Sequence, residues 1–66
     1  MNEEIDAAMK RVMQAVEAFE ESKTLENARE LEWKLTMLKL LIGADNFDRL
    51  PAFSRALSEA SDFIDK

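Results

Sequence analysis

The sequence predicts an all-α fold, in which a helical hairpin and a third helix form a small three-helix bundle that associates into an oligomeric bundle. Apolar residues recur at spacings of three and four in three successive segments, which is the period of amphipathic helices. The chain has one glycine and one proline: Gly43 directly follows the second segment, and Pro51 lies at the start of the third. We therefore predict a single helical domain, residues 1–66, with helices over residues 2–22, 25–42 and 48–64.

The first helix carries one apolar seam. Asn2 can cap its N-terminus, and Glu3 and Glu4 favour the positive end of the helix dipole. The seam has spacings of 4, 3, 4 and 3 and consists of Ile5, Met9, Val12, Val16 and Phe19. Because the apolar pattern changes phase after Ser22, we predict a tight turn there rather than one continuous bent helix.

The second helix carries two apolar stripes. The first stripe consists of Ala28, Leu31, Leu35, Leu38 and Ile42. The second stripe consists of Trp33, Met37, Leu40 and Ala44, and Leu41 falls between the two. At about 100° per residue, these stripes lie on roughly opposite sides of the helix. Thr24 or Ser22 can cap its start, and Gly43 can supply the left-handed residue that ends it.

The third helix is predicted to follow a loop. Asp45, Asn46 and Asp48 are turn-forming residues, so residues 45–48 predict a connection without regular structure. Asp48 can then cap the helix and place Pro51 in its first turn, where a missing N–H costs little. The apolar face of this helix consists of Leu50, Phe53, Leu57, Ala60 and Ile64.

A compact bundle of these three helices leaves one stripe of the second helix uncovered. Trp33, Met37 and Leu40, with Leu41 beside them, then form an exposed apolar patch of the kind that binds proteins. Small chains also bury too little surface to be very stable alone, and oligomerisation is a common remedy. We therefore predict a homodimer through these four residues. The alternatives are a flat bundle that covers both stripes within one chain, and a different protein seated on the second stripe.

The charge of the chain suggests a second interaction surface. There are 14 acidic and 9 basic side chains, for a formal net charge of −5. Glu17, Glu20 and Glu21 crowd the C-terminal end of the first helix, where the helix dipole disfavours negative charge. A locally unfavourable arrangement can mark function, so these glutamates are a candidate docking patch for a basic protein partner. The alternative is a solvated acidic face that keeps the protein soluble.

Composition argues against several other classes of protein. The chain has no cysteine and no histidine, so it lacks disulfides, the usual zinc ligands and a Ser-His-Asp triad. We expect a protein that is not an enzyme and uses no cofactor or metal. Its acidic balance disfavours direct contact with nucleic acid or an anionic membrane surface. The sequence shows no secretion signal and no run of about 20 apolar residues, so we expect a cytoplasmic protein.

Together these features predict a small acidic protein-binding module, such as an adaptor, chaperone or inhibitor. It would act as a homodimer or dock helix-on-helix on a larger protein. The acidic surface suits an antagonist of a basic nucleic-acid-handling protein, of the type that phages and plasmids encode. A second interpretation is an oligomer that sequesters a small anionic molecule or nucleotide in an interface pocket lined by arginines, with the candidates Arg11, Arg29, Arg49 and Arg55.

Overall fold

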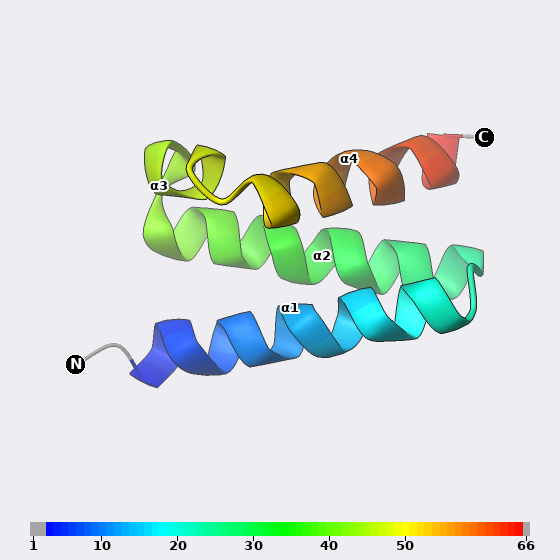
Figure 1. The fold of residues 1–66 in the computed structure, drawn as a ribbon, viewed down its shortest axis with the longest axis horizontal. Helices are drawn as coiled ribbons and strands as arrows, with labels where there is room; N and C mark the ends of the chain where they lie inside the picture. Colours follow the sequence, from blue (N-terminus) through cyan, green and yellow to red (C-terminus); the bar gives the residue numbers. More distant parts are fainter. Residues whose placement is uncertain (1–2, 66) are drawn as a thin grey trace.

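The computed structural model describes residues 3–65, which form four helices (Figure 1). The helices are α1 (Glu3–Glu21), α2 (Leu25–Ile42), α3 (Ala44–Asp48) and α4 (Pro51–Asp65). α2 lies between α1 and α4 and runs antiparallel to both (Figure 1). The predicted all-α bundle of three main helices is confirmed, while the predicted cap Asn2 lies outside the described residues. No helix within residues 3–65 has both the length and the apolar character needed to cross a membrane.

The core lies on one side of α2, where α1 and α4 pack against it. Four residues of the first stripe have at most 1% of their surface exposed: Ala28, Leu31, Leu35 and Leu38. The other helices complete this core with Val12, Ala15, Phe19, Phe47 and Ala60. The rings of Phe19 and Phe63 meet edge to face with their centroids 5.5 Å apart, so they join α1 to α4 directly. α4 is also joined to α2 by a hydrogen bond of 2.9 Å, which the hydroxyl of Ser61 donates to the carboxylate of Glu32.

A tight turn joins α1 to α2, as the change of apolar phase predicted. Thr24 is the N-cap of α2, and its hydroxyl accepts a hydrogen bond of 3.1 Å from the backbone N–H of Asn27. The side-chain amide of Asn27 reaches back across the turn and donates to the carbonyl oxygens of Ser22, at 2.8 Å, and Ala18, at 3.3 Å. The same carbonyl oxygens also accept backbone N–H bonds of 2.9 Å, Ala18 from Ser22 and Ser22 from Thr24, so the amide of Asn27 adds a second donor to each and ties the start of α2 to the end of α1.

The connection between α2 and the last helix differs from the prediction. Residues 44–48 form the short helix α3 instead of a loop, and Asp48 is its last residue rather than the cap of the next helix. Phe47 explains the difference, because only 1% of its surface is exposed and a compact helical turn carries its ring into the core. Asn46 supports this turn by donating a hydrogen bond of 2.8 Å to the carbonyl oxygen of Ile42 at the end of α2.

Gly43 and Pro51 mark the two ends of this connection. Gly43 has φ of 93° and ψ of 150°, so its positive φ agrees with the prediction, but its ψ lies outside the left-handed helical region. This backbone conformation is essentially restricted to glycine, and it separates α2 from α3. Pro51 is the first residue of α4, as its place in the first turn predicted. A residue before proline avoids helical backbone geometry, so Leu50 is non-helical and separates α3 from α4.

We expect Phe47→Ala to lower the free energy of unfolding by about 3 to 5 kcal/mol, because it leaves a cavity under α3. Urea denaturation at a fixed protein concentration, followed by circular dichroism, measures the change. Asp48→Ala in the same short helix is the matched control and should change stability by no more than about 0.5 kcal/mol, because Asp48 is exposed. Equal effects of the two substitutions would contradict the role given to Phe47.

Asn27→Ala should destabilise the protein by about 1 to 2 kcal/mol, because two carbonyl groups at the end of α1 lose their side-chain donor. Gln14→Ala is a suitable control, since Gln14 is an exposed residue in the middle of α1. The same denaturation experiment compares them. If Asn27→Ala is as stable as Gln14→Ala, the amide of Asn27 does not stabilise the turn.

Candidate protein-interaction surface

The side of α2 that points away from the core is apolar and exposed. Trp33 has 65% of its surface exposed, Leu40 76%, Met37 48% and Leu41 44%. These four residues are called here the outer face of α2. They alternate along the helix with the buried first stripe, so they lie on the side that α1 and α4 leave uncovered. The flat bundle that would cover both stripes is therefore not the structure of this chain, although α2 does lie between its two neighbours (Figure 1).

α1 extends this surface with two small residues and two charges. One hollow beside the outer face is lined by Ala8, Arg11, Trp33, Lys34 and Met37. A second, adjoining hollow is lined by Glu4, Ala7, Ala8, Arg11, Met37 and Leu41. The apolar pattern of the sequence alone did not predict that Glu4, Ala7 and Ala8 belong to an interaction surface. The sequence feature that could have predicted them is the spacing of Glu4, Ala8 and Arg11, which places these three residues on one flank of α1 beside its apolar seam.

An ion pair borders the outer face near its N-terminal end. Lys34 Nζ lies 3.2 Å from Glu30 Oε1, four residues away on the same helix, and both side chains are partly exposed. Pairs of this type stabilise a helix by only about 0.3 to 0.5 kcal/mol. The pair therefore contributes little to the fold, and it places polar groups at the border of the apolar surface.

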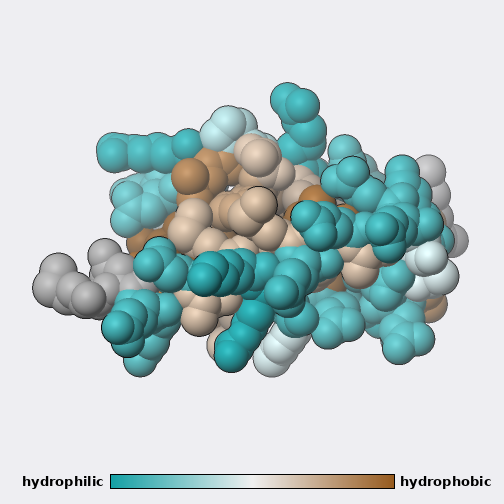
Figure 2. All heavy atoms as spheres, turned by 60° about the horizontal axis from the view of Figure 1, so that its bottom comes forward, coloured by the Kyte–Doolittle hydropathy of each residue, from teal (hydrophilic) through white to brown (hydrophobic). Residues whose placement is uncertain are grey.

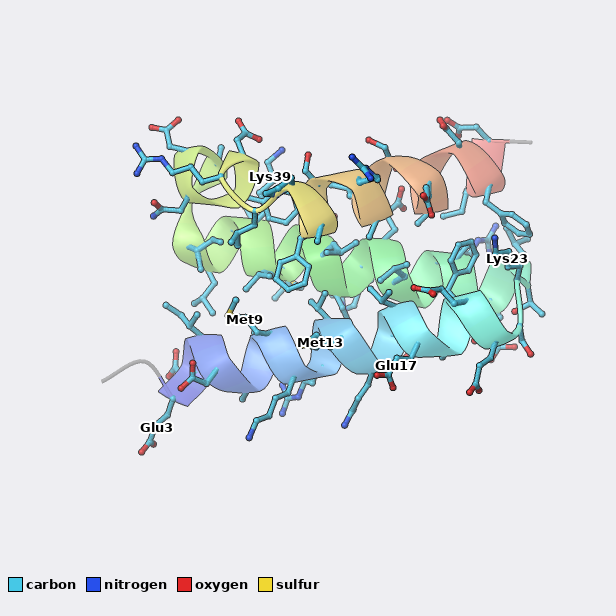
Figure 3. All side chains as sticks on the ribbon, viewed as in Figure 1. Glu3, Met9, Met13, Glu17, Lys23 and Lys39 are labelled. Carbon is cyan, nitrogen blue, oxygen red and sulfur yellow. The ribbon has the colours of Figure 1, made fainter. Side chains whose placement is uncertain are left out.

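The three glutamates of the predicted acidic docking patch are all exposed. Glu20 lines a groove between α1 and α4 together with Arg55 and Glu59. Glu17 points away from the other helices (Figure 3). No ion pair of Glu17, Glu20 or Glu21 is formed within residues 3–65, where Lys34 and Glu30 are the pair within 4.0 Å. The last turn of α1 has no basic residue, so this end of the helix is strongly acidic.

A further apolar region lies on the side of α1 opposite the outer face of α2. Met13 is 55% exposed and Met9 is half-buried. Both are labelled on α1 in Figure 3. Figure 2 shows the molecule turned so that α1 comes forward. In that view apolar side chains gather in the middle and hydrophilic ones surround them. Methionine is common core filling, yet Met13 and Met37 both lie at the surface of this chain.

Three of the four candidate arginines lie in different hollows of the structure. Arg11 lines the hollows beside the outer face of α2, and Arg55 lines the groove between α1 and α4. Arg49 lines a third hollow at the end of the bundle, beside Ile5, Met9 and Leu50. Within one chain, these arginines therefore form no common anion site. Across residues 3–65, no three acidic side chains gather into a group that could hold a metal ion.

Comparison with known proteins adds no family to these observations. No protein-family model matches the chain, and no match to it was found among curated proteins or solved structures.

Trp33 is the only tryptophan of the chain and reports directly on the outer face of α2. In dilute solution we expect acrylamide to quench its fluorescence readily, because most of the indole is in contact with water. The quenching constant of the folded protein, compared with that of the urea-unfolded chain, measures this exposure. Weak quenching at every concentration tested, typical of a buried indole, would contradict the exposed position of Trp33.

Proposed function

We propose that this protein is a non-enzymatic protein-binding module that self-associates into a homodimer through the outer face of α2. The observation that supports this proposal is the exposure of Trp33 and Leu40 on one helix whose opposite side is fully packed. Tryptophan is enriched among the residues that contribute most to protein interfaces. Contiguous apolar surface on a small protein is typical of a binding site.

The energetic balance favours a partner that covers the whole outer face of α2. Burying a large apolar side chain is worth roughly 1.5 to 3 kcal/mol. In a symmetric dimer both copies bury these four side chains. The total free energy gained from this burial is of the same order as the cost of association, roughly 4 to 15 kcal/mol. Association then depends on every large residue of the face, and loss of two of them should abolish it.

The acidic end of α1 gives this module a second surface. Glu17, Glu20 and Glu21 are exposed and do not line the hollows beside the outer face of α2, so dimerisation leaves them accessible. Their charge would steer a basic protein towards the dimer and speed its binding. The proposal therefore includes an adaptor or inhibitor role towards a basic partner, such as a protein that handles nucleic acid.

The double substitution Trp33→Ala and Met37→Ala tests self-association. We expect the unaltered chain to sediment at about twice 7.6 kDa at micromolar concentration and the variant at 7.6 kDa. Loss of these side chains from both copies should weaken the dimer by roughly 4 kcal/mol or more, about 1000-fold in Kd. Sedimentation equilibrium measures both masses. Native mass spectrometry separates a doubled chain from a chain carrying a small molecule.

Two substitutions elsewhere on the surface serve as controls. Met13→Ala and Leu25→Ala each remove an exposed apolar side chain that lines neither hollow beside the outer face of α2, so both should still dimerise. The helical signal of the Trp33→Ala/Met37→Ala variant should match that of the unaltered chain. A 7.6 kDa species for the unaltered chain, or a dimer that survives the double substitution, would refute self-association through this face.

A further inference from the structure

We propose that the second copy docks antiparallel and in one register, with Arg11 of each copy paired to Glu4 of the other and the two α2 helices crossing at Met37. This inference rests on the proposed function and adds its geometry and its source of specificity. It also assigns a role to α1, which the apolar residues of α2 do not show by themselves.

The register follows from the order of residues along the exposed surface. Trp33 and Lys34 share one hollow with Arg11, whereas Leu41 shares the adjoining hollow with Glu4. Met37, Ala8 and Arg11 line both hollows, and Met37 and Ala8 lie at the middle of the surface. Because α1 runs antiparallel to α2 (Figure 1), Arg11 lies one turn from Ala8 towards Trp33, and Glu4 lies one turn from Ala8 towards Leu41. The surface therefore has a basic end beside Trp33, an acidic end beside Leu41 and an apolar centre.

A two-fold axis through this centre, perpendicular to the helices and lying in the interface, exchanges the two ends. Trp33 of one copy then faces Leu41 of the second copy, and Met37 faces its own counterpart. Met37 is midway between Trp33 and Leu41 in the sequence, so the two ends of α2 match across the axis. The same operation places Arg11 of each copy over Glu4 of the other, which forms two equivalent ion pairs.

The spacing on α1 agrees independently with the same axis. The midpoint of Glu4 and Arg11 falls between Ala7 and Ala8, and Ala8 is beside Met37 in both hollows. One axis thus satisfies α2 and α1 together. The short side chains of Ala7 and Ala8 let the two α1 helices approach closely at the point where they cross, so the aligned charges can meet.

Charge selects this arrangement over the parallel one. With the two-fold axis along the helices, equivalent ends would lie at the same end of the dimer, so both copies of Arg11 would gather at one end and both copies of Glu4 at the other. Like charges brought together at an interface oppose association, and complementary charges set its register. The antiparallel register is the arrangement that pairs Arg11 and Glu4, the two charges that α1 contributes to this surface, with their opposites.

The size of the molecule is sufficient for such an interface. Standard protein interfaces bury roughly 800 Å² on each partner. The bundle measures 37 by 19 by 15 Å between its Cα extremes and exposes 4954 Å², so a lengthwise face is of the required order. Two copies stacked on such faces form one layer of α1 and α2 on another.

Charge reversal tests the register. Glu4→Arg and Arg11→Glu should each weaken the homodimer by about tenfold, because each creates two like-charge contacts. An equimolar mixture of the two variants should instead form a heterodimer, in which both contacts again join opposite charges. The double variant Glu4→Arg/Arg11→Glu should dimerise as the unaltered chain does. Native mass spectrometry resolves these species by mass, and sedimentation gives each dissociation constant.

Asp6→Arg and Lys10→Glu are the matched controls. Asp6 lies in the first turn of α1, like Glu4, and Asp6 and Lys10 are exposed residues that line neither hollow. Their single variants should dimerise normally, and their mixture should show no preference for the heterodimer. A preference for the heterodimer that is lost at high salt supports the register, because salt screens exposed charges.

Two results overturn the register for different reasons. If the unaltered chain dimerises and Trp33→Ala/Met37→Ala does not, but the mixture of Glu4→Arg and Arg11→Glu shows no preference for the heterodimer, the register is wrong and self-association stands. If the unaltered chain is a 7.6 kDa monomer at micromolar concentration, both the register and self-association are refuted.

Discussion

Apolar side chains surround most of the circumference of α2, and this short chain has only two other long helices with which to cover them. α1 and α4 both pack against the stripe of Leu31, Leu35 and Leu38, because a shared core lets the two helices also contact each other through Phe19 and Phe63. Moving one of them to the opposite side of α2 would divide one core into two smaller ones. The outer face of α2 is exposed as a consequence of that packing.

The polar groups of the chain act mostly at helix ends. Asn27 and Asn46 each donate their side-chain amide to carbonyl oxygens at the end of the preceding helix, and Thr24 caps the start of α2. In the part of the chain that the structure describes, no polar or charged side chain is buried, so the core is entirely apolar. The polar and charged side chains of these residues lie at helix ends and on the surface.

The small size of the core bears on the proposed function. Among residues 3–65, the core consists of nine buried residues, which leaves limited stability, and any partner that binds only the folded chain adds to that stability. A dimer formed through α1 and α2 would do so while leaving α4 and the acidic end of α1 accessible. The same surface would then complete the fold and bring two acidic ends into one particle, where a basic partner could contact both.

The sequence by itself determined the helical class, the limits of α2, the place of Pro51 and the presence of two opposed stripes on one helix, and it limited the N-cap of α2 to Thr24 or Ser22. Each of these depends on local chemistry or on helical period, which the order of residues records. The tertiary structure decided what local chemistry leaves open. The sequence predicts a loop from the turn-forming residues Asp45, Asn46 and Asp48. Burial of Phe47 in a core formed by distant residues instead makes this segment helical. Likewise, only the packing of α1 beside α2 brings Glu4 and Arg11 to the border of the outer face, because these residues lie about 30 positions from Met37 in the chain.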